Sequence, residues 1–473
     1  MQFDLNGTSL PRKDDLTAIG QGHVFQYWND LSEGQRRDLL ADLNSINLGE
    51  LSKLATIAAS PVPAHVASRI EPAKVIRAAD VPAHARAQGC ELLSKGRVAA
   101  FTVAGGQGTR LGFDGPKGAF QISPVMNKSL FQLFAESILA TDRRYGCAMR
   151  WYIMTSSGND SATREYFVSN RYFGLAQERV RFFQQGVMPA FDRAGKILLD
   201  DKHRIALSPD GHGGSLLALA RTGMLAEMAA HGIRHISYFQ VDNPLVYCLD
   251  PVFIGLHDTH QSEMSSKTLS KADDLERVGN FVMADGRLAI IEYSDLPEAL
   301  AHAKNTDGSR RFDAANIAVH LLSRGFIERL TRDAAAFALP WHRAEKKIPY
   351  IDLDTGRRIE PAQANGVKLE SFVFDALPLA DRAILLETSR AEEFSPIKNA
   401  SGIDSVETAR RDMSRRAARW MEVAGFQIPC DTSGAPEGFF EISPLFSLDS
   451  DELKSKSLSQ RSIRPGESVY LSA

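Results

Sequence analysis

Cysteine is scarce in this sequence, which has four cysteines in a chain of 473 residues. Cys90, Cys147, Cys248 and Cys430 stand far apart, and no two of them form the CxxC spacing that is typical of structural zinc sites. This scarcity argues against both a disulfide framework and a cysteine-based zinc site. It indicates a reducing compartment.

Long hydrophobic runs are also missing. A membrane-spanning helix needs about 18 or more consecutive apolar residues, and no such run occurs. The opening segment, MQFDLNGTSLPRKDD, lacks the apolar core of a signal peptide. We therefore expect a cytoplasmic protein without a membrane partner.

Positive charge is not in excess either, because the net charge is −3 and the sequence pI is near 6.5. A protein that binds the phosphate backbone of nucleic acids needs a basic face, so we expect no nucleic-acid partner. The hydrophobic fraction of 44% in so long a chain exceeds what one core usually holds, which predicts two or three domains.

The first part of the chain has the pattern of helices. Residues 14–46 space their apolar side chains at three and four positions, and SEGQ at 32–35 has the polar residues of a helix start. Residues 60–83 are interrupted by prolines and have the composition of a linker. We predict a helical N-terminal region over residues 1–95.

From residue 98 the pattern changes to short apolar runs separated by helix-like segments such as SLFQLFAESILA. The runs predict buried strands: VAAFTV, WYIMTS, VRFFQQ and HISYFQVDN. Strands alternating with helices indicate an α/β fold with a mainly parallel sheet, in which ligands bind at the carboxyl ends of the strands. We predict this catalytic domain over residues 96–395 and a small C-terminal domain, rich in Gly, Pro and Ser, over residues 396–473.

A glycine-rich stretch, AGGQGTRLGFDGPKG at 104–118, follows the first of these strands and is typical of a phosphate-binding turn. It is not a dinucleotide fingerprint, because the last position of GxGxxG is Leu111. It is not a P-loop, because Pro116 precedes Lys117 and Gly118 follows it. The HRD and DFG partners of a kinase glycine loop are absent from the sequence.

This stretch resembles the nucleotide loop of the UDP-sugar pyrophosphorylases, and more narrowly of the eukaryotic-type UDP-N-acetylglucosamine pyrophosphorylases. The resemblance continues in the family's order from about residue 98 to 445, and it includes FFQQGVMPAF, SPDGHGGSLLAL, VDNPLV, FDAANIAVHLL, NGVKLESFVFD, FSPIKNA and FEISPLFS. It implies a Rossmann-like, GT-A-like nucleotidyltransferase fold with a mixed, mainly parallel sheet flanked by helices.

The resemblance also implies an activity, in which UTP and a sugar 1-phosphate give a UDP-sugar and pyrophosphate. N-acetylglucosamine 1-phosphate is the favoured substrate. A glucose-1-phosphate enzyme or a broad-specificity UDP-sugar pyrophosphorylase is the alternative within the enzyme class, and a nucleotide-sugar binding or regulatory module is the alternative outside it. The oligomeric state that we expect is a monomer or a weak homo-oligomer.

By resemblance, one set of residues binds the nucleotide: Ala104, Gly105, Gly106, Gly108, Thr109, Gln185 and Gly211. The charged residues that meet phosphates, and that we assign as catalytic, are Arg110, Lys117 and Lys398. Gln185 would read uracil through its carboxamide, although a hydrogen bond from Gln184 or Gln185 to the backbone is the alternative.

The resemblance assigns Asp242, at the end of an apolar strand, as a ligand of Mg²⁺ that also contacts substrate. The alternative is an aspartate that caps the next turn. For the sugar, the matching residues are Gly279, Glu292 and Asn316, with His212 in PDGHGG beside them.

His212 departs from the family pattern. The N-acetylglucosamine enzymes usually have asparagine at this position, and relatives that use unmodified sugars typically read GHGD. His212 either binds the sugar or ribose or is satisfied by the backbone. The other histidine pairs suggest no zinc site: Gly232 interrupts the helix between His231 and His235, and HDTH at 257–260 reads as a solvated turn.

Overall fold

The computed structural model describes residues 13–60, 67–333, 339–456, 458 and 462–472. The chain divides into two compact units. The first contains residues 1–66, 185–218 and 338–375, and the second contains residues 67–184, 219–337 and 376–473. The three-part division that the sequence suggests follows other boundaries and stays a prediction.

The first unit combines helices with short strands. Its helices are α1 (Lys13–Ala18), α2 (Glu33–Ser45) and α3 (Leu51–Ala59). The predicted helix start at SEGQ is confirmed: Ser32 Oγ accepts from the Gln35 N–H, and the Gln35 side chain accepts from the Ser32 N–H, which forms a capping box. The linker prediction falls partly on residues 61–66, which lie outside the described residues.

The strands of the first unit are short, and most of them form two-stranded ribbons. A three-stranded antiparallel sheet orders them as β15 (His342–Lys346), β18 (Gly366–Glu370) and β6 (Phe191–Asp192). The ribbons pair β5 (Val187–Pro189) with β9 (Leu207–Pro209), β7 (Leu199–Asp201) with β8 (Arg204–Ile205), and β16 (Tyr350–Ile351) with β17 (Arg358–Ile359).

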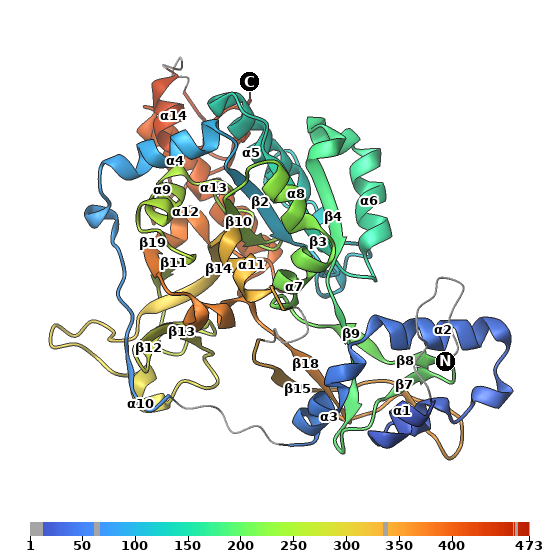
Figure 1. Cartoon of the computed structure of the whole chain (residues 1–473). Coiled ribbons are helices and arrows are strands. Elements are labelled where there is room, and N and C mark those ends of the chain that lie inside the picture. Colours follow the sequence, from blue (N-terminus) through green and yellow to red (C-terminus); the bar gives the residue numbers. More distant parts are fainter. Residues whose placement is uncertain (1–12, 61–66, 334–338, 457, 459–461, 473) are drawn as a thin grey trace. The chain divides into compact units, whose positions relative to one another are not determined.

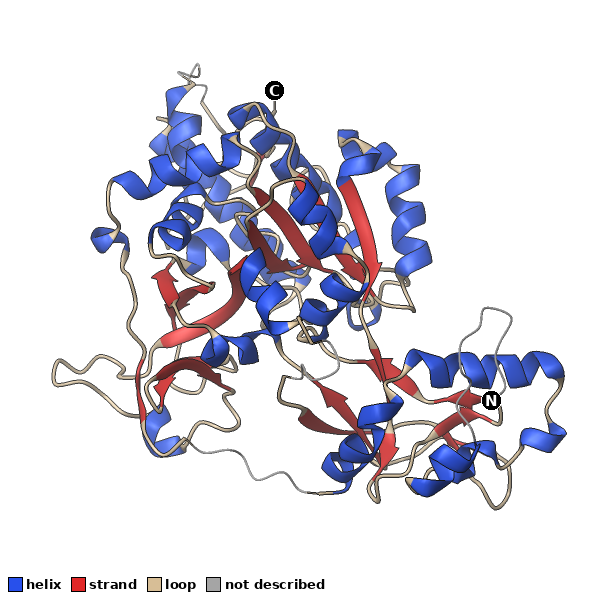
Figure 2. Ribbon diagram, in the orientation of Figure 1, coloured by secondary structure: helices blue, strands red, loops and turns tan. Residues whose placement is uncertain are grey.

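The second unit is built on a ten-stranded mixed sheet (Figure 1). Four strands are parallel: β10 (His235–Gln240), β2 (Val98–Val103), β3 (Arg150–Thr155) and β4 (Val180–Gln184). These are the four apolar runs predicted as strands, and the predicted mixed α/β class is confirmed. β2, β3 and β10 are buried on both faces because helices cover both sides of the sheet (Figure 2), whereas β4 lies at the edge and exposes Arg181 and Gln184.

The rest of the sheet is mostly antiparallel. β14 (Ala314–Ser323) pairs with β10, and next to it lie β11 (Met264–Ser270), which is parallel to β19 (Ala383–Glu387), and β12 (Asn280–Ala284). β13 (Arg287–Ile291) and the short β1 (Ile70–Pro72) both pair with β12.

One large apolar core joins this sheet to its helices. It draws on α4 (His84–Ser94), α5 (Leu130–Tyr145), α6 (Asp160–Ser169), α9 (Pro251–Thr259) and α13 (Val406–Val423). Further helices of this unit are α8 (Met224–Ala230), α10 (Glu298–Ala301), α11 (Arg324–Leu330) and α12 (Arg390–Glu393). α7 (Gly214–Arg221) includes the boundary between the units.

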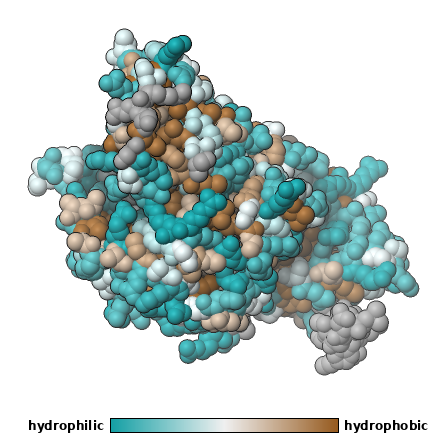
Figure 3. Space-filling view, turned by 90° about the horizontal axis from the view of Figure 1, so that it is seen from above, coloured by the Kyte–Doolittle hydropathy of each residue, from teal (hydrophilic) through white to brown (hydrophobic). Residues whose placement is uncertain are grey.

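The end of the chain has a small core of its own. α13 packs against β20 (Phe439–Ile442), which is parallel to β21 (Ser468–Leu471), and against α14 (Ser450–Ser455). Among the described residues, no helix is long and apolar enough to cross a membrane. On the face shown in Figure 3, hydrophilic residues cover most of the visible surface.

Candidate active site

The glycine loop begins where β2 ends, and side chains behind it hold its carbonyl groups. Asn159 Nδ2 donates to the carbonyl oxygens of Ala104 (2.8 Å) and Gly106 (3.2 Å), and Ser156 Oγ donates to that of Gly105 (2.9 Å). Because three consecutive carbonyls are fixed from one side, the loop has one defined shape.

Three backbone N–H groups near the start of the same loop are not used by the part of the protein that the structure describes. Among the described residues, none accepts a hydrogen bond from the N–H groups of Gly105, Gly106 or Gln107, and Gly106 and Gln107 are exposed. The Gly108 N–H donates to Gly115 (2.9 Å) and closes the loop. Adjacent N–H groups without an internal acceptor form a concavity that suits an anion.

Thr109 and Arg110 continue the loop as a short 3₁₀ turn and are both exposed. Within the described part of the chain, no carboxylate pairs with the Arg110 guanidinium. The positive charge of Arg110 is therefore available to a phosphate group that is bound on the loop.

Three of the predicted charged residues meet at one backbone position, Ile397. The Ile397 N–H donates to the carbonyl oxygen of Asp242 (2.9 Å), and the Ile397 carbonyl accepts from Lys117 Nζ (3.3 Å). Lys398 is the next residue, and its ammonium group lies 3.5 Å from Asp404 Oδ2. Residues far apart in the sequence thus place two lysines and an aspartate around Ile397.

Asp242 lies just past the carboxyl end of β10 and is half-buried. In the described residues no basic side chain pairs with its carboxylate, and no group of three His, Cys, Asp or Glu side chains could hold a metal alone. Such a site fits Mg²⁺, which takes one or two carboxylates and completes its shell with substrate phosphates and water. The turn cap is instead Asn243, whose Oδ1 accepts from the Leu245 N–H (3.2 Å).

The predicted sugar residues of the second unit lie together. A Cβ added at Gly279 would lie 2.7 Å from Ile290 Cγ2, 3.0 Å from Glu292 Oε1 and 3.7 Å from Asn316 Cβ, so Gly279 lies next to both Glu292 and Asn316. The Asn316 N–H donates to the Gly279 carbonyl (2.8 Å), and Asn316 Oδ1 accepts from the Ala318 N–H (2.9 Å). Ala318 is left-handed, with φ of 56°, and it turns the strand β14 locally at this point.

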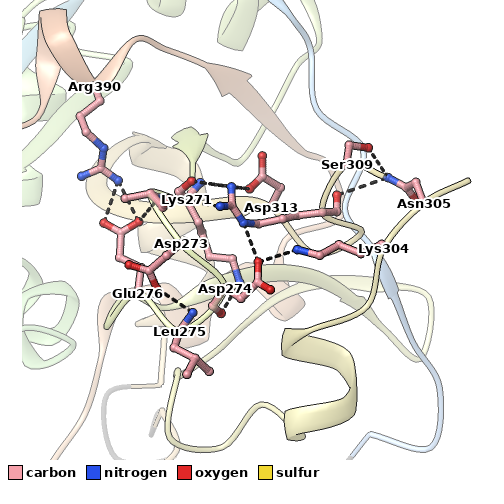
Figure 4. A network of polar contacts seen from close by, with 12 residues as sticks. Lys271, Asp273, Asp274, Leu275, Glu276, Lys304, Asn305, Ser309, Asp313 and Arg390 are labelled. Carbon is pink, nitrogen blue, oxygen red and sulfur yellow. Dashed lines mark hydrogen bonds and ion pairs between the residues drawn. The ribbon is translucent and has the colours of Figure 1, made fainter. Parts of the chain in front are cut away.

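A charged network borders this group of residues (Figure 4). Arg390 of α12 pairs with both carboxylate oxygens of Glu276 (2.7 and 2.9 Å), three residues before Gly279. Nearby, the Asp274 carboxylate accepts from Lys304 Nζ (2.6 Å) and from Arg310 Nε (2.8 Å). These ion pairs fix the turn that leads into the Gly279 segment.

Gln185, Gly211 and His212 belong to the first unit. Gln185 follows β4 directly, and the Gly186 carbonyl after it accepts from the Asp210 N–H (3.1 Å). Gly211 has φ of +84°, and a Cβ there would lie 2.3 Å from the Ser371 carbonyl oxygen, so glycine is required on both counts.

His212 packs in an aromatic stack. Its ring stacks on Phe372 (centroids 5.2 Å apart), and Phe372 stacks in turn on His342 (4.3 Å). His212 Nδ1 accepts from the Val373 N–H (3.1 Å), so the backbone occupies one of its two ring nitrogens. Burial lowers the pKa of His212 to about 4, so the ring is neutral and carries its proton on Nε2.

One interpretation of the sequence is wrong. HDTH is not a solvated turn, because His257 is completely buried in α9, where its ring nitrogens lie 2.7 Å from Ser265 Oγ and 3.0 Å from Ser323 Oγ. The helical spacing of PVFIGLHDT, which continues an apolar face to His257, indicates this burial.

Some residues that hold the backbone of the site were not predicted from the sequence. Ser156 and Asn159 fix the glycine loop from the end of β3, and Asn243 fixes the segment around Glu393. Each is a small polar residue just after a predicted strand. Because ligands bind at the carboxyl ends of parallel strands, this position could have indicated a role in the site.

Known proteins resemble this chain over most of its length. A family model described as UTP–glucose-1-phosphate uridylyltransferase matches residues 56–423. The UDP-N-acetylglucosamine pyrophosphorylase of Saccharomyces cerevisiae is 36% identical over 445 residues, which cover 87% of this chain and 91% of that protein. UDP-N-acetylglucosamine diphosphorylase 2 of Arabidopsis thaliana is 33% identical over 469 residues and covers 93% and 90%.

Solved structures give the same result. The uridine diphosphate N-acetylglucosamine pyrophosphorylase of Trypanosoma brucei has a TM-score of 0.79 at 28% identity, with 95% of each chain covered. The UDP-glucose phosphorylase of the same organism has a TM-score of 0.65 at 16% identity, with 80% of each chain covered, which shows the fold alone. The chain therefore belongs to the UTP–glucose-1-phosphate uridylyltransferase family and is a nucleotidyltransferase.

Proposed function

We propose that this protein transfers the uridylyl group of UTP to N-acetylglucosamine 1-phosphate and releases pyrophosphate. The names of relatives that match most of the chain at 33–36% identity support this substrate. The name of the family model and His212 support glucose 1-phosphate or a broader range of sugars as the second candidate. A binding module without activity is set aside, because the chain is a nucleotidyltransferase.

The observation that carries the proposal is the meeting of Lys117, Asp242 and Lys398 at Ile397. In this reaction a phosphate oxygen of the sugar 1-phosphate attacks the α-phosphorus of UTP in line. A phosphomonoester has a second pKa of about 6, so this nucleophile is already ionised at neutral pH and needs no general base. The protein has to position the two substrates and neutralise their charge, which two lysines and a metal site can do.

Within this scheme the triphosphate binds the N–H groups of Gly105, Gly106 and Gln107, and it lies against the rest of the loop from Ala104 to Thr109. Arg110 and Lys117 pair with its oxygens. Lys398 faces the phosphate that undergoes transfer. A bond forms between the sugar phosphate oxygen and the α-phosphorus while the bond to the β-phosphate oxygen breaks, and the electron pair leaves with pyrophosphate.

We propose Mg²⁺ as the cation that Asp242 holds. When bound, it neutralises charge on the phosphates of the nucleotide. We also propose that Gln185 reads uracil and that Gly211 and His212 lie against the bound nucleotide sugar. Glu292 and Asn316 then hydrogen-bond sugar hydroxyl groups, since a carboxylate accepts and a carboxamide both donates and accepts.

We further propose the cytoplasm as the compartment and a monomer or weak homo-oligomer as the active form. The scarcity of cysteine and the described residues' lack of a membrane-spanning helix are compatible with this compartment. Sedimentation of the purified protein at several concentrations checks the oligomeric form.

The experiment that tests the function measures pyrophosphate release from UTP and Mg²⁺ with four sugar 1-phosphates: N-acetylglucosamine, N-acetylgalactosamine, glucose and galactose. We expect the highest kcat/KM with N-acetylglucosamine 1-phosphate. A matched His212→Asn variant restores the residue usual in the N-acetylglucosamine enzymes, and it is expected to keep the preference. A higher kcat/KM for glucose 1-phosphate in the wild type would instead support the second candidate.

A further inference from the structure

Asn243 follows Asp242 in the loop after β10, which we call the metal loop because Asp242 is the proposed Mg²⁺ ligand. Asn243 connects this loop to the segment that carries Lys398. Asn243 is buried, its Nδ2 donates to the Glu393 carbonyl (2.7 Å), and its Oδ1 accepts from the Ser395 N–H (3.2 Å). Together with the hydrogen bond from Ile397 to Asp242, these contacts join residues 242–243 to residues 393–397 at every second residue. The two segments are thereby held in a fixed register.

A buried ion cluster lies next to the contact between residues 242–243 and residues 393–397, which we call the junction. Lys267 of β11 is only 1% exposed, and its ammonium group lies 2.5 and 2.6 Å from the two carboxylate oxygens of Glu393 and 2.7 Å from Asp250. Thr388 Oγ1 donates to the same carboxylate of Glu393 (2.9 Å). Burial alone would lower the pKa of Lys267, but the two carboxylates raise it above its ordinary value, so the lysine stays charged.

A second cation, the half-buried Arg416, also binds the backbone of these segments. Arg416 of α13 donates through one nitrogen, Nη1, to the carbonyl oxygens of Leu245 (2.8 Å) and Glu392 (3.0 Å). The Glu392 carboxylate in turn accepts from Trp420 Nε1 (2.8 Å). The short helix α12 is thus fixed at its end by groups from β11, α13 and the metal loop, immediately before the chain reaches Lys398.

The side chain of Lys398 is only weakly restrained. Its side chain is 44% exposed, and its ion pair with Asp404 spans 3.5 Å, which is a weak restraint. Where the ammonium group lies relative to Asp242 therefore depends on the backbone of residues 393–397. Buried ion pairs contribute little net stability because desolvation offsets their attraction, so stability alone is a poor explanation for this cluster.

We propose that Asn243, Lys267 and Glu393 are positioning residues, which set the place of Lys398 relative to Asp242 during uridylyl transfer. They touch no reacting atom and act through the backbone of residues 393–397. The inference rests on the proposed function, because it assigns these residues to the same site. Misplacing a catalytic group by about 1 Å can reduce the rate about 10²-fold, which is enough to detect.

The test compares Asn243→Ala, and the charge-neutral double variant Lys267→Met with Glu393→Gln, with a matched control. The control is Lys128→Met, which breaks another buried ion pair, with Glu136 (2.5 Å; the side chains are 7% and 8% exposed). Lys128 has no described contact with residues 242–243 or 393–398. Steady-state kinetics, UTP affinity by calorimetry and amide hydrogen exchange are measured on all three.

We expect kcat to fall about 10²-fold in the two junction variants, with UTP affinity nearly unchanged. Amide exchange should accelerate in residues 394–399 but not in the central strand β2. Lys128→Met should lose stability without this loss of kcat. If the double variant does not fold, Asn243→Ala decides, since it removes no charge.

Two results would overturn the inference. One is a folded Asn243→Ala protein with wild-type kcat. The other is unchanged amide exchange in residues 394–399. A wild-type protein that forms no UDP-sugar would overturn the proposed function instead, and the exchange measurement would still show whether Asn243 fixes this segment.

Discussion

The two lysines of the candidate site differ in how they are held. Both are half-buried, but Lys117 donates to the Ile397 carbonyl, whereas Lys398 has only a long ion pair with Asp404 (3.5 Å). A restrained lysine suits a phosphate that is bound throughout the reaction. A lysine with freedom to move suits charge that develops on the transferred phosphate, so its removal should affect turnover more than binding.

Lys398→Ala is therefore expected to lower kcat about 10²- to 10³-fold, the usual effect of removing one group that stabilises developing charge. UTP affinity should fall much less. Kinetics and calorimetry measure the two effects separately. Lys454→Ala, at an exposed lysine of α14, is the control. Unchanged turnover in the Lys398 variant would remove this lysine from the mechanism.

His212 makes stability depend on pH. Burial lowers its pKa from 6.5 to about 4, so the folded protein binds this proton less readily than the unfolded chain does. Its contribution to stability is complete above pH 6.5 and is lost as the pH falls towards 4. From pH 7 to pH 5, the unfolding free energy of the wild type should fall about 2 kcal/mol more than that of His212→Asn.

Denaturant titrations at the two pH values check this prediction. An equal loss in both proteins would mean that His212 accepts a proton in the folded state, contrary to its buried position and its hydrogen bond from Val373.

At the residue scale, the sequence predicted what depends on local pattern. Glycines after an apolar strand predict a tight turn at the end of β2, and the position of Asp242 after HISYFQV predicts that it lies at the carboxyl end of β10. The partners of these residues depend on tertiary contacts, and no local pattern carries them. Neither the donation from Asn159 to the glycine loop nor the meeting at Ile397 could be read from spacing.

At the scale of elements, α4 and α9 approach each other closely because both have glycine at the contact. A Cβ at Gly89 would lie 1.8 Å from the Pro251 carbonyl oxygen, and a Cβ at Gly255 would lie 1.8 Å from that of Ala85. Asp250 caps the start of α9: one of its carboxylate oxygens accepts from the Val252 N–H (2.9 Å), and the other lies 2.7 Å from the Lys267 ammonium group. A shift of α9 therefore reaches the buried ion cluster.

Gly89→Ala is expected to destabilise the protein by about 1 to 3 kcal/mol or more, because the backbone of α9 must move. Gly325→Ala is the matched control, since Gly325 lies in helix α11 with open space around its Cβ position, and alanine favours a helix by about 1 kcal/mol. Thermal unfolding of both variants checks the prediction. Equal melting temperatures for the two variants would contradict the close contact.

The turn around Asp274 depends on charge. Lys304, His302 and Arg310 hold the pKa of the Asp274 carboxyl well below its usual range, so this carboxylate stabilises the turn above pH 3.8 and the effect is lost at lower pH. Asp274→Asn should speed tryptic cleavage after Lys304 and Arg310 throughout pH 5 to 8, where trypsin is usable.

Glu298→Gln, a nearby exposed carboxylate on α10, is the control for the change of charge. High salt should reduce the difference between wild type and Asp274→Asn, since exposed ion pairs are screened. Cleavage at the wild-type rate in Asp274→Asn would show that the network leaves the turn unaffected.

Elements were predicted best where the pattern was strong. The four parallel strands and the helix that starts at Leu130 follow from apolar runs and were confirmed. The antiparallel part of the sheet was not predicted in its pairing. β11 has the sequence MSSKTLS, whose mostly polar residues do not predict a buried strand, and only the structure shows that Lys267 is buried and paired with Asp250 and Glu393.

At the scale of the whole molecule, the second unit brings together segments that span most of the sequence. Its sheet places the ends of β2, β3 and β10 at one edge, and α12 and α13 add the segment with Lys398 to that edge from the end of the chain. The sequence predicted this arrangement of distant segments only through the family resemblance. Contacts between residues hundreds of positions apart leave no periodic pattern of apolar residues in the sequence.

The central claim is that a sugar 1-phosphate attacks the α-phosphorus of UTP. The most direct measurement uses N-acetylglucosamine 1-phosphate with ¹⁸O in its non-bridging phosphate oxygens, followed by ³¹P NMR of the products with Mg²⁺ present. We predict that all of the label stays in the UDP-sugar, including the new bridging oxygen, and that pyrophosphate is unlabelled. Label in the released phosphate product, or UMP in place of the UDP-sugar, would contradict the account.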